Sequence, residues 1–409
     1  MSESRTSTQA ALALEDQFGA HNYHPLPVVL SLGEGVFVWD AEGKRYFDFL
    51  SAYSAVNQGH CHPQIVSAMI EQAQKLTLTS RAFFNDRLGL TEQFLCNLFG
   101  YGKVLMMNSG AEAVESSLKL ARKWAYEVKG IPDHKARIVT CSGNFHGRTI
   151  GIISFSSDEA ETRNHFGPFA PGFSVVEFGN SDSLKSEFEK GDVAAFLVEP
   201  IQGEAGVVIP PDGYLSRAKQ LCEEYNVLFM ADEIQSGLGR AGKMLACEYE
   251  GVRPDVLILG KALSGGMMPV SAVLADDAIM SVFEPGTHGS TYGGNPLACA
   301  VTIAAMNVIA DEGLVENSFR LGEVFRSELG KIRHPMLELV RGRGLMNAMV
   351  IRGGRSAWDL CLAMKDRGLL AKPTHEHIIR LAPPLVINED QILECAGIIS
   401  DSISSFPAT

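Results

Sequence analysis

Short apolar runs alternate with longer helical patterns from about residue 100 onward, and this alternation constrains the fold more than any other feature. The runs are KVLMMN, RIVTCS, GFSVVEF, VAAFLVEP, VLFMADE, DVLILG and VSAVLA. Strands this short and this apolar, separated by helices, are typical of a mostly parallel sheet that is buried on both faces. The sequence therefore predicts an α/β protein built around such a sheet.

The two ends of the chain differ from this central part. The segment GVFVWDAEGKRYFDFL predicts strands around a turn, and charged helices with short strands follow residue 311. We therefore expect residues 55–310 to form a large α/β domain. Residues 1–54 should contribute an N-terminal segment to a smaller α+β domain that residues 311–409 complete.

Charge and cysteine usage narrow the class of protein. The formal net charge is −13 and no dense basic cluster occurs, which argues against a nucleic-acid or membrane partner. The cysteines are scattered without a C-x-x-C pair, which indicates reduced thiols. No apolar segment reaches the ~18 residues of a membrane span. The N-terminus lacks a secretory pattern, so we expect a cytoplasmic protein, or a mitochondrial-matrix protein if a presequence was removed.

Ligands bind at the carboxyl ends of strands in open α/β sheets, so the residues after each apolar run are candidate site residues. After KVLMMN, Ser109 and Glu112 match a capping box, and Gly110 permits a tight turn. The start of such a helix can bind an anion, although an ordinary capped helix has the same pattern. After RIVTCS come an aromatic residue, Phe145, and a cation, Arg148.

Two further strand ends carry ionisable groups. Asp232 directly follows VLFMA, where a buried carboxylate needs a cationic partner. Lys261 follows DVLILG, and on pattern alone it is equally a lysine where a buried strand meets solvent. Together with the aromatic residue and the anion-binding helix, however, these groups are what a pyridoxal phosphate enzyme requires. The lysine amine binds the cofactor aldehyde, and the aspartate keeps the ring nitrogen protonated.

Two other patterns are excluded as sites. GLGRAG, residues 237–242, matches a dinucleotide fingerprint but does not directly follow its strand. The His and Cys residues of GHCHP and THEH lack the spacing of a zinc site, so no metal is expected.

Longer stretches resemble the class III, or subgroup II, pyridoxal phosphate-dependent aminotransferases. These include SAYSAVNQGHCHP, NFHGRT, VEPIQGEAGVV, ADEIQSGLGR, LGKALSGG, HGSTYGGNPL and IIRLAPPLV, and they cover nearly the whole chain. The resemblance implies fold type I, the aspartate-aminotransferase-like fold, with pyridoxal 5'-phosphate as cofactor. Within the family the chain is most similar to the ornithine aminotransferases. The acetylornithine and 4-aminobutyrate aminotransferases share most of these motifs and remain alternatives.

The resemblance also implies roles for single residues. Lys261 would hold the cofactor and move the substrate proton, and Asp232 would pair with the pyridine nitrogen. The other implied cofactor contacts are Gly110 and Ala111 to the phosphate, Phe145 and Gln235 to the ring, and Ser290 and Thr291 to the phosphate of the partner subunit. The active unit would then be a homodimer with shared active sites.

The implied substrates are small molecules, L-ornithine and 2-oxoglutarate, in proline biosynthesis and arginine catabolism. Tyr23 and Tyr53 match residues that bind the distal amino-acid end of ornithine, and Arg148 would bind its α-carboxylate. Arg380 would bind the α-carboxylate of glutamate, and Glu204 would mask Arg380 during the ornithine half-reaction.

Two positions depart from common family residues, and two other classes of function stay open. His146 and Met268 stand where many members have aromatic residues, and we expect both outside the catalytic set, at the pocket rim. An aminomutase such as glutamate-1-semialdehyde aminomutase would use the same scaffold without an oxo-acid acceptor. A non-catalytic binding protein would lack the absorption band of a lysine-bound cofactor.

Overall fold

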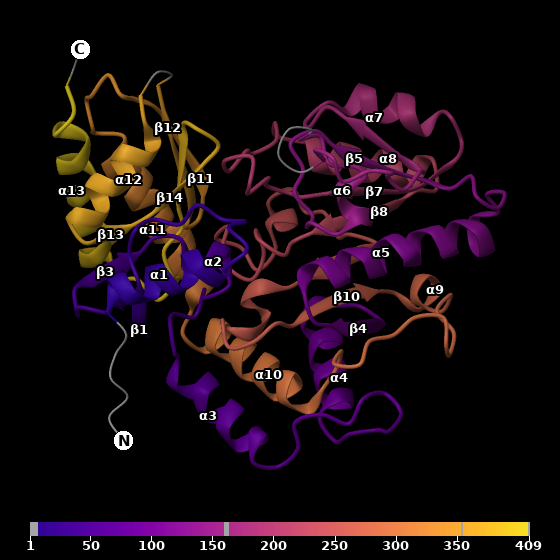
Figure 1. The fold of residues 1–409 in the computed structure, drawn as a ribbon. Helices are drawn as coiled ribbons and strands as arrows, with labels where there is room; N and C mark the ends of the chain where they lie inside the picture. Colours follow the sequence, from indigo (N-terminus) through magenta and orange to yellow (C-terminus); the bar gives the residue numbers. More distant parts are fainter. Residues whose placement is uncertain (1–6, 159–162, 353–354, 408–409) are drawn as a thin grey trace.

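The computed structural model describes residues 7–158, 163–352 and 355–407, which form two lobes (Figure 1). The larger lobe contains a seven-stranded sheet in the order β4-β10-β9-β8-β7-β5-β6. Its strands are β4 (Lys103–Met107), β5 (Arg137–Cys141), β6 (Phe173–Val176), β7 (Val193–Val198), β8 (Leu228–Asp232), β9 (Val256–Leu259) and β10 (Ser271–Ala275). Each strand lies in one of the seven apolar runs. All neighbours pair in parallel except β10, which is antiparallel to β4 and β9, so the predicted mostly parallel sheet is confirmed.

Helices cover both faces of this sheet, and every residue of β7, β8, β9 and β10 is buried. The helices and short turns of the large lobe are α3 (Pro63–Ala73), α4 (Leu88–Phe99), α5 (Gly110–Trp124), η1 (Ala125–Lys129), α6 (Ile150–Ile153), α7 (Ser181–Phe188), α8 (Tyr214–Glu224), η2 (Ala246–Glu250), η3 (Lys261–Ser264), α9 (Asp277–Met280) and α10 (Pro296–Asp311). The predicted capping box at Ser109 and Glu112 is formed at the start of α5.

The smaller lobe contains both ends of the chain (Figure 1). One sheet has the order β1-β2-β3-β13 and the other β11-β12-β15-β14. The elements are α1 (Thr8–Phe18), β1 (Leu30–Glu34), β2 (Phe37–Asp40), β3 (Arg45–Asp48), α2 (Ser51–Ser54), α11 (Leu314–Leu329), β11 (Leu337–Arg343), β12 (Met346–Ile351), α12 (Ala357–Asp366), β13 (Leu369–Leu370), β14 (Lys372–Thr374), β15 (Ile378–Leu381) and α13 (Glu389–Ser404). Because β3 pairs with β13, the N-terminal segment is hydrogen-bonded to the C-terminal part.

No single helix among the residues described is long and apolar enough to cross a membrane. Only α10 and α11 together meet that test of length and composition, and they are bent by 55° where they meet. Both helices bury residues in the protein core.

A buried arginine joins the two lobes. The Arg240 side chain is fully buried and lies in the loop after β8. Its guanidinium donates to Asn57 Oδ1 at 2.6 and 3.2 Å, to the Leu345 carbonyl at 3.1 Å and to the Pro383 carbonyl at 2.6 Å. Burial lowers the pKa of Arg240 to about 9, still well above neutral pH. Its acceptors therefore hold a charged group, and each hydrogen bond to it is stronger than one between neutral groups.

The segment α2 is a left-handed turn rather than an ordinary helix. Ser51, Ala52, Tyr53 and Ser54 have φ angles of 49°, 46°, 61° and 75°. The left-handed conformation costs roughly 1–2 kcal/mol for each residue other than glycine. Four such residues in succession therefore require strong local hydrogen bonding.

Candidate functional site

A cavity of about 190 Å³ lies at the carboxyl ends of the central strands. It is lined by Gly110, Ala111, Phe145, His146, Gly147, Glu199, Ile201, Asp232, Ile234, Gln235 and Lys261. The structure thus brings together six of the eight predicted cofactor residues, namely Gly110, Ala111, Phe145, Asp232, Gln235 and Lys261. The lining residues come from the ends of separate strands because parallel strands end at the same edge of the sheet.

The start of α5 provides the anion-binding side of the cavity. Ser109 Oγ accepts from the Glu112 N–H at 3.2 Å, and the Glu112 carboxylate accepts from the Ser109 N–H at 2.7 Å. The first N–H groups of a helix have no partner within it, and the helix start carries a partial positive charge. Gly110 and Ala111 line the cavity at this point. A Cβ at Gly110 would lie 3.1 Å from the Ile234 side chain, so glycine keeps this wall open.

His146 lies inside the catalytic set, and the expectation that it would lie outside at the pocket rim is wrong. Its Nδ1 is 2.7 Å from Asp232 Oδ2, and both side chains are buried. The loop after β5 therefore supplies a hydrogen-bond partner for the buried Asp232. Burial disfavours the imidazolium, but the hydrogen bond and charge of Asp232 outweigh this effect and raise the pKa of His146.

Glu199 is a second buried acid of the site, and it follows β7 as Asp232 ends β8. The same strand-end rule could have identified it from the sequence, but it was missed. Its carboxylate accepts from the N–H of Phe145 at 2.9 Å and of Gly203 at 3.4 Å. Burial, partly offset by the charge of His146, raises the pKa of Glu199 to about 7. Glu199 thus fixes the backbone that carries the aromatic Phe145.

The Lys261 amine lies in a low-polarity setting with acidic neighbours. Burial lowers the pKa of Lys261, while the negative charges of Glu204 and Asp232 oppose this effect. Lys261 also has a φ of 46°, a strained left-handed conformation of the kind that clusters at functional sites. A lysine with a lowered pKa is a better nucleophile at neutral pH because more of it is uncharged.

The predicted masking pair is formed. Arg380 Nη1 and Glu204 Oε1 form an ion pair at 2.5 Å, and Gln235 Nε2 donates to the same oxygen at 3.2 Å. Burial would raise the pKa of Glu204, but the charge and hydrogen bond of Arg380 outweigh it and lower that pKa. The ring of Tyr53 lies 4.9 Å from the Arg380 guanidinium.

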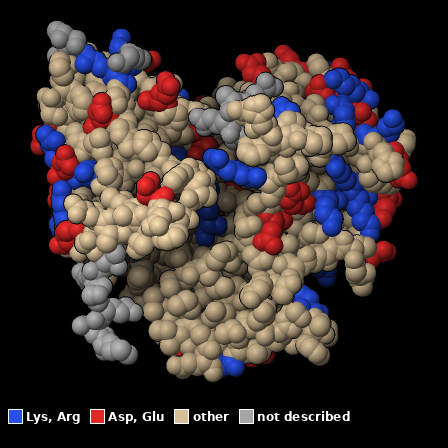
Figure 2. All heavy atoms as spheres, viewed as in Figure 1, with Lys and Arg blue, Asp and Glu red and all other residues tan. Residues whose placement is uncertain are grey.

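The other predicted substrate residues lie outside the lining of the cavity at the strand ends. Tyr23 and Tyr53 line an adjoining cavity of about 450 Å³. Arg148 is exposed, with its guanidinium 5.7 Å from the Phe145 ring, and its charge reaches Tyr53. Figure 2 shows the furrow between the two lobes, with basic side chains beside it.

Three predicted residues lie elsewhere among the described parts of the chain. Ser290 and Thr291 do not line the cavity at the strand ends. Ser290 Oγ instead accepts from Asn108 Nδ2 at 2.9 Å, just before α5. Met268 is half-buried and packs against the hydrophobic core, also away from the residues that line the cavity.

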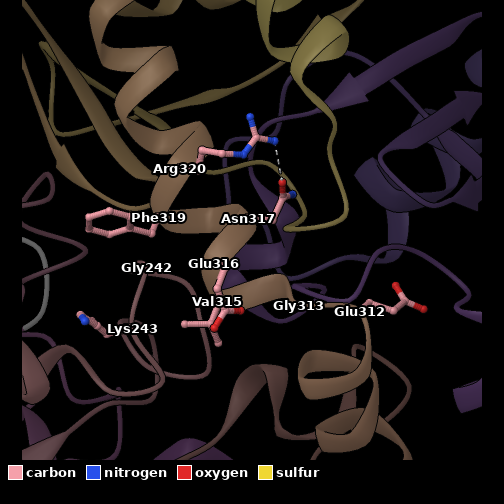
Figure 3. A pocket seen from close by; sticks show the side chains of 9 residues that line it. All are labelled: Gly242, Lys243, Glu312, Gly313, Val315, Glu316, Asn317, Phe319 and Arg320. Atoms are coloured by element: carbon pink, nitrogen blue, oxygen red, sulfur yellow. Dashed lines mark hydrogen bonds between the residues drawn. The ribbon is translucent and has the colours of Figure 1, made fainter.

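A larger hollow of about 650 Å³ lies where α11 begins, and it does not carry this chemistry. Lys243 and Phe319 extend toward the same side of it from different segments (Figure 3). Arg320 turns toward Asn317 on its own helix, at 3.5 Å (Figure 3). It also forms an ion pair with Glu389. We therefore assign the reactive site to the smaller cavity at the strand ends.

The residues of that cavity fit an aldehyde-bearing, phosphorylated aromatic ring. The helix start suits the phosphate, Phe145 suits the ring face, and Lys261 suits the aldehyde. Asp232 accepts from His146 and from the Ile234 N–H at 3.1 Å, and a carboxylate has further lone pairs for a ring N–H. Pyridoxal 5'-phosphate, the predicted cofactor, has each of these groups.

Comparisons with known proteins agree with this chemistry. The family model for aminotransferase class-III matches residues 18–403. The mitochondrial ornithine aminotransferase of Drosophila melanogaster is 56% identical over 398 residues, covering 97% of this chain and 92% of that protein. The ornithine aminotransferase structure from Toxoplasma gondii, described as having partial occupancy of pyridoxal phosphate at the active site, has a TM-score of 0.97. It is 45% identical and covers 98% of this chain and 95% of that one. An acetylornithine aminotransferase structure from Elizabethkingia anophelis has a TM-score of 0.89 and 55% identity, covering 98% and 99%.

The pair between His146 and Asp232 predicts a pH-dependent stability. The folded-state pKa of His146 is raised, so the stabilisation is complete below the unfolded pKa of about 6.5 and is lost as the pH rises through the folded value. His146→Phe should lower the unfolding free energy by about 1–3 kcal/mol at acidic pH. The difference in unfolding free energy between wild type and variant should shrink at higher pH. Thermal unfolding of the cofactor-free proteins at several pH values measures it. A difference that stays constant across pH would contradict a charged His146.

Proposed function

This chain belongs to the class-III aminotransferase family, and from that membership we propose that it is an ornithine δ-aminotransferase. It transfers the δ-amino group of L-ornithine to 2-oxoglutarate and yields glutamate 5-semialdehyde and glutamate. The semialdehyde then cyclises to pyrroline-5-carboxylate, because its amine and aldehyde lie close together in one molecule. The observation that carries the proposal is the ion pair between Glu204 and Arg380 beside Lys261.

Pyridoxal 5'-phosphate, when bound, supplies an aldehyde for the amine exchange and a ring that withdraws electrons from the substrate carbon. Lys261 would hold the cofactor and would move a proton at the substrate carbon. Asp232, itself held by His146, would pair with the ring nitrogen. Phe145 would contact the ring face, and Gln235 would contact the ring hydroxyl.

Different substrate-binding residues act in the two half-reactions. Arg148 binds the α-carboxylate of ornithine, and Tyr23 and Tyr53 bind its amino-acid end, so the δ-amine points toward Lys261. Glu204 masks Arg380 in this half-reaction. When glutamate or 2-oxoglutarate enters, the α-carboxylate replaces Glu204 on Arg380, since a carboxylate pair of this geometry can be exchanged for another.

We further propose a homodimer with shared active sites, in which Ser290 and Thr291 reach the phosphate of the partner subunit. Neither residue lines the cavity at the strand ends of its own chain, as far as the described residues go. Phe83 and Phe84 are 72% and 95% exposed, and a partner would cover such apolar surface. A monomeric mass by light scattering would contradict this proposal.

The same function would place the enzyme in proline biosynthesis and arginine catabolism. We propose that it works in the cytoplasm, with the mitochondrial matrix as the alternative that the name of the Drosophila relative suggests. Cell fractionation distinguishes the two compartments.

The decisive test is a single half-reaction. Ornithine alone, added to the cofactor-loaded enzyme, should give about one equivalent of pyrroline-5-carboxylate for each site, because no oxo acid regenerates the cofactor. Trapping with an aromatic amino aldehyde and mass spectrometry identify the product. Lys261→Ala is the matched control and should be slower by several orders of magnitude.

Other amine donors test the alternatives in the same assay. Acetylornithine is the second candidate, because the similar Elizabethkingia anophelis structure is an acetylornithine aminotransferase. A protein that converts acetylornithine or 4-aminobutyrate but not ornithine would refute the proposed substrate. Turnover of an amino aldehyde without any oxo acid would indicate an aminomutase.

The masking role of Glu204 predicts an unequal effect on the two half-reactions. Glu204→Ala should leave the glutamate half-reaction intact or faster, because Arg380 is then always available. It should slow productive δ-transamination by about tenfold or more and allow attack through the α-amine of ornithine. Single-turnover rates and product identification measure both effects. Glu376→Ala removes an exposed carboxylate between β14 and β15 and should change neither rate.

The opposite result would refute the mask. If ornithine chemistry were unchanged in Glu204→Ala while the glutamate half-reaction collapsed, the ion pair would only order its loop.

A further inference from the structure

We propose that Asp48 and His60 are positioning residues that hold Tyr53 in the substrate site and thereby set the affinity for ornithine. Neither residue belongs to the cavity at the strand ends. Both line the adjoining cavity of about 450 Å³ together with Tyr23 and Tyr53. The inference rests on the proposed function, which assigns Tyr53 to the binding of ornithine.

The element on which the pair acts is the left-handed turn α2. This turn is on the side of the small lobe that faces the large one (Figure 1). All four of its residues have positive φ and none is glycine. Strained backbone of this kind persists only where surrounding groups determine it, and it clusters at ligand sites. The groups that hold the turn therefore decide where Tyr53 lies.

Asp48 holds the start of the turn. Its Oδ1 accepts from the N–H of Leu50 at 2.8 Å and of Ser51 at 2.9 Å. Its Oδ2 is 2.8 Å from His60 Nε2. Both carboxylate oxygens are thus engaged, and the Asp48 side chain has one defined orientation.

His60 is itself fixed by its backbone. Its N–H donates to the Gly35 carbonyl at 2.8 Å, and its carbonyl accepts from the Gly35 N–H at 3.0 Å. The imidazole therefore extends from backbone that is paired with Gly35, in the turn between β1 and β2. Because the backbone of His60 is fixed, its imidazole can orient Asp48, whereas a flexible surface side chain could not.

The turn α2 is also hydrogen-bonded to the segment directly after the strand that carries Arg380. Ser51 Oγ donates to the Ala382 carbonyl at 2.7 Å, directly after β15. The turn is thus held against β15, and the Tyr53 ring lies 4.9 Å from the Arg380 guanidinium. If the turn relaxed to ordinary backbone, the ring would leave both Arg380 and the substrate cavity.

The first experiment compares the two substrates of the cofactor-loaded enzyme. Asp48→Ala removes the acceptor of two N–H groups and should raise the KM for ornithine by about tenfold, with a smaller change in kcat. The glutamate half-reaction should change by less than about twofold, because Tyr53 does not bind glutamate in the proposed mechanism. His60→Ala keeps both N–H bonds and should give a smaller rise, so it replaces Asp48→Ala if that variant does not fold.

The second experiment is a rescue by glycine. Glycine adopts positive φ without steric cost, so Ala52→Gly in the Asp48→Ala background should restore most of the lost affinity for ornithine. Ala55→Gly is the matched control, because Ala55 has φ −84° and gains nothing from that freedom. In a Tyr53→Ala background, Asp48→Ala should have no further effect on KM, since both changes remove the same contact.

The outcomes separate the inference from the proposed function. A wild-type enzyme that does not convert ornithine would refute the proposed function. If the wild type is active, the positioning role is refuted when Asp48→Ala leaves the KM for ornithine unchanged. It is also refuted when Asp48→Ala weakens the affinities for ornithine and glutamate equally. Equal rescue by glycine at positions 52 and 55 would refute it as well, because the left-handed turn would then not be the element on which Asp48 acts.

Discussion

The site depends on the buried guanidinium of Arg240, because this group joins three of the chain segments that contribute residues to it. Arg240 follows Asp232 by eight residues, and its acceptors Asn57 and Pro383 follow Tyr53 and Arg380 by four and three residues. A buried charge needs well-oriented partners, since an unsatisfied one costs several kcal/mol. The same hydrogen bonds that satisfy Arg240 thereby hold the substrate residues of the small lobe against the strand ends of the large lobe.

Buried acids in the cavity are satisfied by two different means. Asp232 is hydrogen-bonded to the His146 imidazole, whereas Glu199 has mainly backbone N–H groups and a pKa raised to about 7. The two acids therefore have different partners, although both lie at strand ends. Asp232 remains the one that can hold a positive charge on a bound ring, and Glu199 serves to orient the loop of Phe145.

Strands and strand-end residues were predictable from the sequence, and contacts between distant loops were not. Apolar runs bounded by turns located all seven strands, and the strand-end rule then selected Asp232 and Lys261. The contact of His146 with Asp232 was missed because β7 lies between β5 and β8, and strand order is not visible in a single sequence. The left-handed turn at Tyr53 was missed because it contains no glycine, the usual signal for positive φ. The roles inferred from family resemblance for the site residues, including Tyr23, Ser290 and Thr291, remain predictions.

The proposed exchange of partners on Arg380 needs Glu204 to move without disturbing its loop, and the hydrogen bonds permit this. Thr374 Oγ1 donates to the backbone carbonyl of Glu204 at 2.6 Å, so the backbone is tied to β14, while the side chain has two partners among the residues described. Those partners, Gln235 and Arg380, both lie in the site. A carboxylate that enters the site can therefore take over the bond to Arg380. The cation stays in place when Glu204 leaves, because Arg380 lies on β15, which is paired with β12 and β14. A small side-chain rotation then suffices to switch the site between its two substrates.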